Sequence, residues 1–78
     1  MSNTVLNLKA MYELKWNYNY NLNRYYNGCN YIEEHINEAD KYLPELMSIK
    51  ENIEILLDEI MKHQQVSENE ILNGFDIQ

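Results

Sequence analysis

The residues best suited to acid–base or metal chemistry are few and poorly grouped. Glu34, His35 and Glu38 share one side of a predicted helix, and Cys29 and His63 are the other candidate ligands. This spacing does not match the Cys and His sets that bind zinc. The two glycines of the chain stand far apart, so no glycine-rich loop can cradle a phosphate group. We therefore predict that the chain is not an enzyme and that it holds no metal ion or cofactor.

Aromatic side chains are the most informative feature of the first part of the chain. Tyr12, Trp16 and Tyr20 recur every four residues, which places their rings along one edge of a helix, opposite its predicted core stripe. Trp and Tyr are enriched at binding hot spots because they offer a large contact area with few rotatable bonds. The spacing predicts a face that binds a larger partner protein, which the chain regulates or inhibits. The alternative is that these rings only cover the core of a small domain.

Acidic residues are concentrated in the second part of the chain. Residues 1–31 carry a charge of +2 and residues 32–78 carry −9, which together give the net charge of −7. Glu51, Glu54 and Asp58 fall on successive turns of a predicted helix, opposite its apolar side. One interpretation is a solvated face that keeps the protein in solution. The other is a phage-encoded inhibitor of a nucleic-acid enzyme, of the anti-CRISPR or anti-restriction type, whose carboxylates imitate phosphates.

Composition narrows the classes of partner. Six Lys and Arg against 13 Asp and Glu in 78 residues disfavour direct binding to nucleic acid or to a membrane surface, because both rely on basic residues. No apolar run is long enough to span a bilayer, and no signal-peptide pattern is present. The lone cysteine cannot close a disulfide within the chain, which predicts a cytoplasmic protein. Homodimerisation, or assembly as a purely structural module, is a further way to stabilise so small a core.

The elements that must position these residues are predicted to be helices. Gly28, Pro44 and Gly74 are the only residues of their kinds, and each predicts a helix boundary. Ser67 and Glu70 have the spacing of a capping box, which predicts the start of a short helix. The predicted helices cover residues 4–27, 31–43, 44–65 and 68–73.

Apolar periodicity predicts a small all-α protein, a three-helix bundle with a short C-terminal helix, in a single domain over residues 1–78. The first core stripe runs from Leu8 to Tyr26 and the third from Leu46 to Ile60, with Ile36 and Leu43 in the stripe between them. Residues 66–78 are predicted to fold back as a lid or to remain a tail that binds a partner groove.

Two alternatives to this bundle stay open. Residues 16–23 alternate aromatic or aliphatic side chains with asparagine, which is typical of a strand and allows an α+β fold with a small N-terminal sheet. Mostly apolar residues also continue at helical spacing through Gly28 and up to Pro44, which allows one longer, bent helix. Because glycine costs about 1 kcal/mol and proline about 3 kcal/mol inside a helix, we favour the bundle whose helices are interrupted at Gly28 and Pro44.

Overall fold

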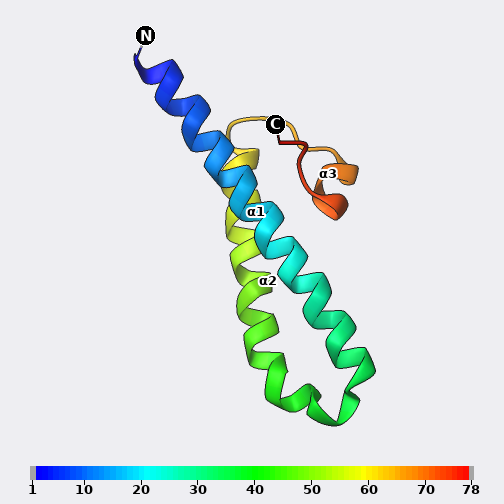
Figure 1. Cartoon of the computed structure of the whole chain (residues 1–78). Coiled ribbons are helices and arrows are strands. Elements are labelled where there is room, and N and C mark those ends of the chain that lie inside the picture. The colour runs from blue at the N-terminus through cyan, green and yellow to red at the C-terminus, as the bar shows by residue number, and fades with distance from the viewer. Residues whose placement is uncertain (1, 78) are drawn as a thin grey trace.

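Two long antiparallel helices form a hairpin, and a short third helix lies beside it (Figure 1). The computed structural model describes residues 2–77, with side chains from residue 8 onward. Helix α1 covers Ser2–Glu34, the 3-10 turn η1 covers Ile36–Glu38, α2 covers Ala39–Met61 and α3 covers Glu68–Asn73. The molecule is elongated, with extents of 54 × 21 × 19 Å. The prediction of an all-α fold with a short C-terminal helix is confirmed, and residues 2–77 contain no strand.

The predicted boundary at Gly28 is wrong, because this glycine lies within α1. A Cβ atom at Gly28 would come within 2.7 Å of Cδ1 of Leu46 on α2. The glycine therefore lets the two long helices approach closely, and this packing offsets its low helix propensity of about 1 kcal/mol. The chain reverses instead at His35, whose backbone leaves the helical region with φ −130° and ψ 57°.

The predicted boundary at Pro44 is also wrong, because α2 begins at Ala39 and the proline lies inside it. The ring of Tyr42 packs edge-on against Tyr31 with 5.2 Å between ring centres, which ties the start of α2 to the end of α1. This contact helps to offset the cost of about 3 kcal/mol that proline imposes inside a helix. Residues 31–43 are therefore not a separate helix: the first of them belong to α1 and the last to α2.

The core lies along the seam between α1 and α2 and is closed on one side by the C-terminal segment. Its buried cluster consists of Tyr18, Leu22, Ile49, Ile53, Ile60 and Phe75. The α1 and α2 members belong to the first and third predicted stripes. The predicted stripe between them does not form a core, because Ile36 and Leu43 are exposed where the chain turns. Leu8 and Tyr26, at the two ends of the first stripe, are exposed as well.

Helix α3 is short but well capped. The Oγ atom of Ser67 accepts a hydrogen bond from the Glu70 backbone N–H at 3.1 Å, and the Ser67 N–H donates to Oε1 of Glu70 at 3.0 Å. The predicted capping box is therefore confirmed. Gly74 ends the helix with a φ of +93°, a conformation that side chains disfavour. This turn directs Phe75 back towards α1.

Tyrosine hydroxyl groups of α1 hold the C-terminal segment against the hairpin. The Tyr18 hydroxyl donates to the carbonyl oxygen of Ile71 at 2.7 Å, and the Tyr26 hydroxyl donates to that of Leu72 at 2.6 Å. The Tyr18 ring meets Phe75 edge-on, with 5.3 Å between ring centres. Each of these tyrosines thus satisfies a carbonyl group at the end of α3, where a helix leaves such groups without internal partners.

The side-chain amide of Asn19 makes a second, paired connection to the same segment. Its Nδ2 donates to the carbonyl oxygen of Phe75 at 2.8 Å, and its Oδ1 accepts from the Phe75 N–H at 2.7 Å. One amide therefore satisfies both backbone groups of Phe75, as a neighbouring strand would. A Cβ atom at Gly74 would lie 2.7 Å from Oδ1 of Asn19, so this arrangement also requires glycine at position 74.

Replacing Asn19 with alanine tests this paired connection. We expect Asn19→Ala to lower the free energy of unfolding by about 1–3 kcal/mol, because it leaves part-buried backbone groups of Phe75 without partners. Urea denaturation followed by circular dichroism measures the change. Asn23→Ala, at an exposed position of the same helix, controls for the difference in helix propensity. Equal effects of the two substitutions would show that the paired connection contributes no stability.

Candidate functional site

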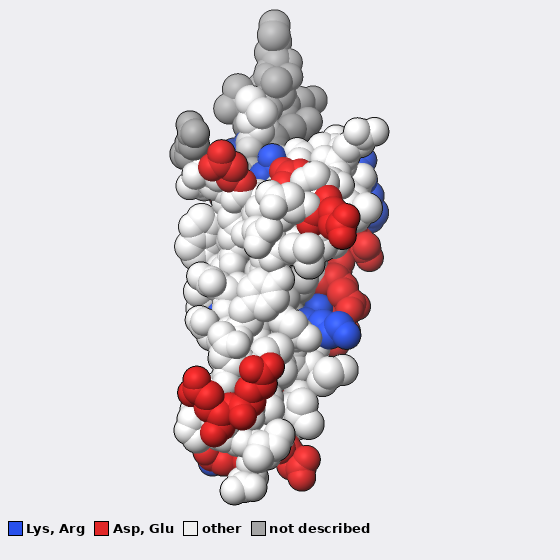
Figure 2. Space-filling model, turned by 90° about the vertical axis from the view of Figure 1, so that its right-hand side faces the viewer, with Lys and Arg blue, Asp and Glu red and all other residues white. Residues whose placement is uncertain are grey.

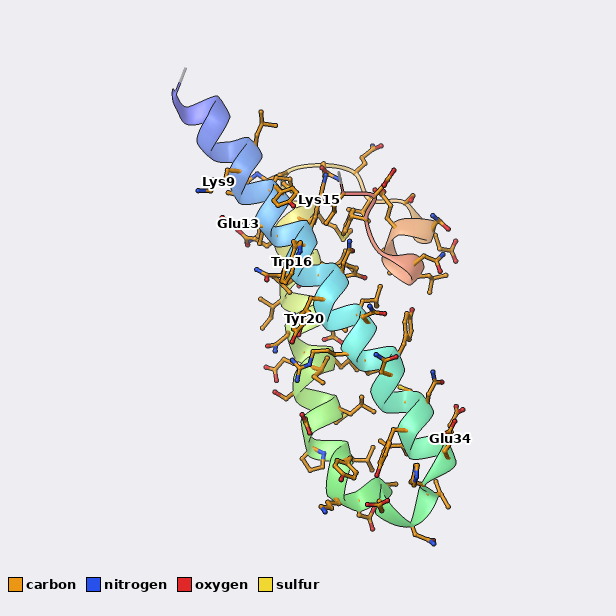
Figure 3. The ribbon with its side chains drawn as sticks, in the orientation of Figure 1. Lys9, Glu13, Lys15, Trp16, Tyr20 and Glu34 are labelled. Carbon is orange, nitrogen blue, oxygen red and sulfur yellow. The ribbon has the colours of Figure 1, made fainter. Side chains whose placement is uncertain are left out.

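Three rings on α1 form the surface that we call the aromatic strip: Tyr12, Trp16 and Tyr20. Their side chains are 47%, 51% and 52% exposed, although each ring is large and apolar. Trp16 and Tyr20 lie along one side of α1, next to Glu13 (Figure 3). The core side of the same helix carries Tyr18, which is only 1% exposed. The strip therefore lies outside the core, as its spacing predicted.

Neighbouring side chains hold two rings of the strip, those of Trp16 and Tyr20, in defined positions. Trp16 and Tyr20 are stacked, with 5.5 Å between ring centres and 8° between ring planes. The Arg24 guanidinium lies 5.7 Å from the centre of the Tyr20 ring. Its Nη2 atom is 3.7 Å from Oε1 of Glu45 on α2. An exposed ion pair adds little stability, but this one orients Arg24 over the ring. Rings that are ordered before binding lose less entropy when a partner covers them.

A shallow groove of about 390 Å³ runs beside the strip, between α1 and the C-terminal segment. The residues that line it are Tyr12, Trp16, Asn19, Tyr20, Asn23 and Ile77. Asn19 also binds Phe75, so the residue that fixes the C-terminal segment helps to shape this groove. Sequence reasoning missed this contribution, because nothing in the local pattern shows that residue 77 returns to the middle of α1.

The acidic residues singled out from the sequence, Glu51, Glu54 and Asp58, are all exposed on α2. Their helical positions place them opposite the core stripe of α2, and we call this surface the acidic face. Exposed apolar side chains lie among them, including Met47 and Ile55, each 59% exposed. The acidic face is therefore amphipathic rather than uniformly charged.

The aromatic strip and the acidic face lie on opposite sides of the hairpin. Each is opposite the core stripe of its own helix, and the two core stripes face each other across the seam. The structure therefore does not bring the two sets of predicted contact residues together. On the face that carries α3, acidic groups lie in separate clusters with uncharged surface between them (Figure 2).

A second groove lies between α1 and α2 near the turn of the hairpin and has a volume of about 380 Å³. Its lining residues include Arg24, Tyr31, Tyr42 and Glu45. The Tyr31 hydroxyl donates to Oε2 of Glu38 at 3.1 Å. The pKa of Tyr31 is raised to about 12. The larger cause is partial desolvation of the ring, and the smaller one is hydrogen bonding with Glu38 and Tyr42. No pattern in the sequence indicates this groove, because the position of the groove depends on where the chain turns.

The residues considered for acid–base or metal chemistry do not form a centre. His35 is exposed and stacks on Tyr31, with 4.1 Å between ring centres. Cys29 is a free thiol of intermediate exposure. Within residues 2–77, no three His, Cys, Asp or Glu residues are grouped so that they could hold a metal ion.

Two further findings concern the chain as a whole. None of the helices in the described part of the chain has both the length and the apolar character needed to cross a membrane. Comparisons of the chain with protein-family models, curated proteins and solved structures find no match. The functional argument therefore depends on the surfaces described above.

Alkaline titration tests the environment of Tyr31. Its pKa is raised from the ordinary value of 10.0 to about 12, so the folded protein keeps this proton when the unfolded chain loses it. The stabilising contribution of the protonated ring is complete below about pH 10 and is lost as the pH rises towards 12. We expect Tyr31→Phe to remove a late component from the ultraviolet absorbance titration of the tyrosinates. An unchanged late component would contradict this assignment of the pKa.

Proposed function

We propose that the chain is a non-enzymatic protein-interaction module of the cytoplasm that binds another protein through the aromatic strip. A regulatory or inhibitory effect on a larger partner is the role that fits a small helical protein of this kind. The observation that carries the proposal is the half-exposure of Tyr12, Trp16 and Tyr20 outside the core. The apolar area that these rings expose to water becomes buried only when the surface of another molecule covers it.

The energetics of the strip support binding rather than core formation. A large aromatic side chain buries about 150–250 Å² when fully covered, so three half-exposed rings retain a substantial apolar area. The buried cluster already contains Tyr18 and Phe75 and does not need Trp16 to close it. The stacking of Trp16 on Tyr20 and the position of Arg24 also give the strip a fixed shape. Trp, Tyr and Arg are the residues most enriched at binding hot spots.

Substitution of Trp16 with alanine tests the proposed contact. We expect Trp16→Ala to change the free energy of unfolding by about 1 kcal/mol or less, because the ring is half-exposed and its main contact is the stack with Tyr20. The same substitution should remove partners that co-purify with the tagged chain from the cells that encode it. Mass spectrometry identifies the partners, and a thermal melt checks that the fold is intact.

A matched control for this experiment is Ile55→Ala. Ile55 is 59% exposed but lies on α2, away from the strip. Its substitution should leave strip-mediated binding unchanged. If Ile55→Ala and Trp16→Ala reduce binding equally, or if neither reduces it, the strip is not the contact surface.

Inhibition of a nucleic-acid enzyme is a second candidate function, carried by the acidic face. Glu51, Glu54 and Asp58 are exposed on one side of α2, where they could enter a basic groove. Electrostatic complementarity of this kind speeds association and is screened by salt. Exposed Met47 and Ile55 among the acids fit a groove that is apolar as well as basic. Lys50, which borders the same surface, reduces its negative charge.

Neutralising the three acids distinguishes the two candidates. We expect the triple variant Glu51→Gln, Glu54→Gln, Asp58→Asn to keep its fold, because all three side chains are exposed. If the acidic face binds, this variant should lose affinity and the affinity of the parent chain should fall steeply between low and high salt. If the strip binds, both changes should be small. Surface plasmon resonance against a co-purified partner measures both.

A further inference from the structure

The side chains along the strip have a spacing that suits pairing with themselves. Tyr12, Trp16, Tyr20 and Arg24 form one row of α1 at intervals of four residues. When a second copy of this row runs in the opposite direction, Trp16 meets Tyr20 and Tyr12 meets Arg24. Each contact then occurs twice, as a twofold-symmetric interface requires. Both pairings are favourable, because the first joins two rings and the second places a guanidinium on a ring.

Helix packing geometry permits this arrangement. A row of residues spaced four apart is inclined to the helix axis, and two such rows lie alongside each other when the helices cross at about 50°. The row from residue 12 to residue 24 is about 18 Å long, at about 1.5 Å per residue. The contact therefore centres on Trp16 and Tyr20, where the rings are already stacked. No element of the hairpin covers this part of α1, since the strip is exposed.

Charge also favours the α1 side for contact between two copies. The chain carries −7 in total, but residues 1–31 carry +2. Two chains that meet through α1 therefore keep the acidic α2 surfaces apart. Glu13 is the only acid in residues 1–31, and it lies beside the strip (Figure 3). In the antiparallel pairing, Glu13 of each chain lies at nearly the same level as Arg24 of the other, so the two can form an ion pair.

The apolar area of two aromatic strips is of the size expected for a dimer that associates weakly. Six half-exposed rings from two strips expose about 450–750 Å², taking about 150–250 Å² for a whole ring. Arg24, Asn23 and Ile77 border the rings and add to the contact. The sum approaches the roughly 1,000 Å² that separates specific interfaces from chance contacts. This size predicts association that depends on chain concentration rather than a permanent dimer.

We propose that the strip of a second copy of this chain occupies the aromatic strip, in an antiparallel, twofold-symmetric α1–α1 pair. This inference rests on the proposed function, because it keeps the strip as the contact surface and names a second copy, in place of a larger protein, as its occupant. The acidic faces of both copies remain exposed on the outer sides of the pair. A homodimer with two outward acidic faces presents the same surface twice to any basic partner.

Analytical ultracentrifugation of the isolated, full chain tests the pair. We expect the mass to rise from 9.4 kDa towards twice that value across the micromolar to millimolar range. Trp16→Ala should weaken association at least about thirtyfold, as expected for a central hot spot. Met61→Ala, at an exposed position at the end of α2 outside both candidate surfaces, should leave it unchanged. A chain that stays monomeric at millimolar concentration, or a dimer that Trp16→Ala leaves intact, overturns the proposal.

A charge swap tests the antiparallel register. Glu13→Arg and Arg24→Glu should each weaken association, because each places like charges opposite one another. The double variant should restore most of the affinity. In a parallel pair, Glu13 and Arg24 would each face their own copy, so each single variant would only exchange one like-charge pair for another and would not weaken association through this contact. Failure of the double variant to recover, with its helical content intact by circular dichroism, overturns this register. If the chain is monomeric but Trp16→Ala still abolishes capture of another protein, the proposed function stands and only the second copy is excluded.

Discussion

The fold depends on closing the open side of a helical hairpin. Two helices can share only a single seam, and one flank of that seam faces solvent unless a third segment covers it. The C-terminal segment closes this flank at Tyr18, which is only 1% exposed. The Tyr18 ring meets Phe75 edge-on, and the Tyr18 hydroxyl donates a hydrogen bond to the carbonyl oxygen of Ile71. The C-terminal segment therefore completes the core that the α1–α2 seam begins. The C-terminal segment borders the aromatic strip at Ile77 but leaves its three rings about half-exposed.

Apolar spacing predicted most of the fold, but not the position of the turn. The core positions of α1 and α2 and the capping box of α3 follow from local patterns, and the structure contains them. The boundaries predicted at Gly28 and Pro44 are wrong because the cost of each residue inside a helix is local, whereas the contacts that offset this cost come from the other helix. The compensation for Gly28 is close contact with Leu46, and that for Pro44 is the packing of neighbouring Tyr42 on Tyr31. Only the paired helices reveal either contact.

The strand-like alternation of residues 16–23 has a helical explanation. One row of residues spaced four apart, containing Trp16 and Tyr20, faces outward, while a second, containing Tyr18 and Leu22, faces the core. The two rows are offset by two residues, so together they produce a period of two. The same offset explains why the strip could be located from sequence. The groove beside it could not, because its far wall is Ile77, more than fifty positions away along the chain.

The pairing of Asn19 with Phe75 has a consequence for the order in which the molecule opens. The hydrogen bonds that join the C-terminal segment to α1 connect residues 46 to 56 positions apart. A segment held by a few such contacts opens locally at a lower free energy than the whole protein unfolds. When it opens, the Tyr18 ring becomes exposed while the seam between α1 and α2 stays closed. The environment of Tyr18 therefore reports on the C-terminal segment rather than on the hairpin.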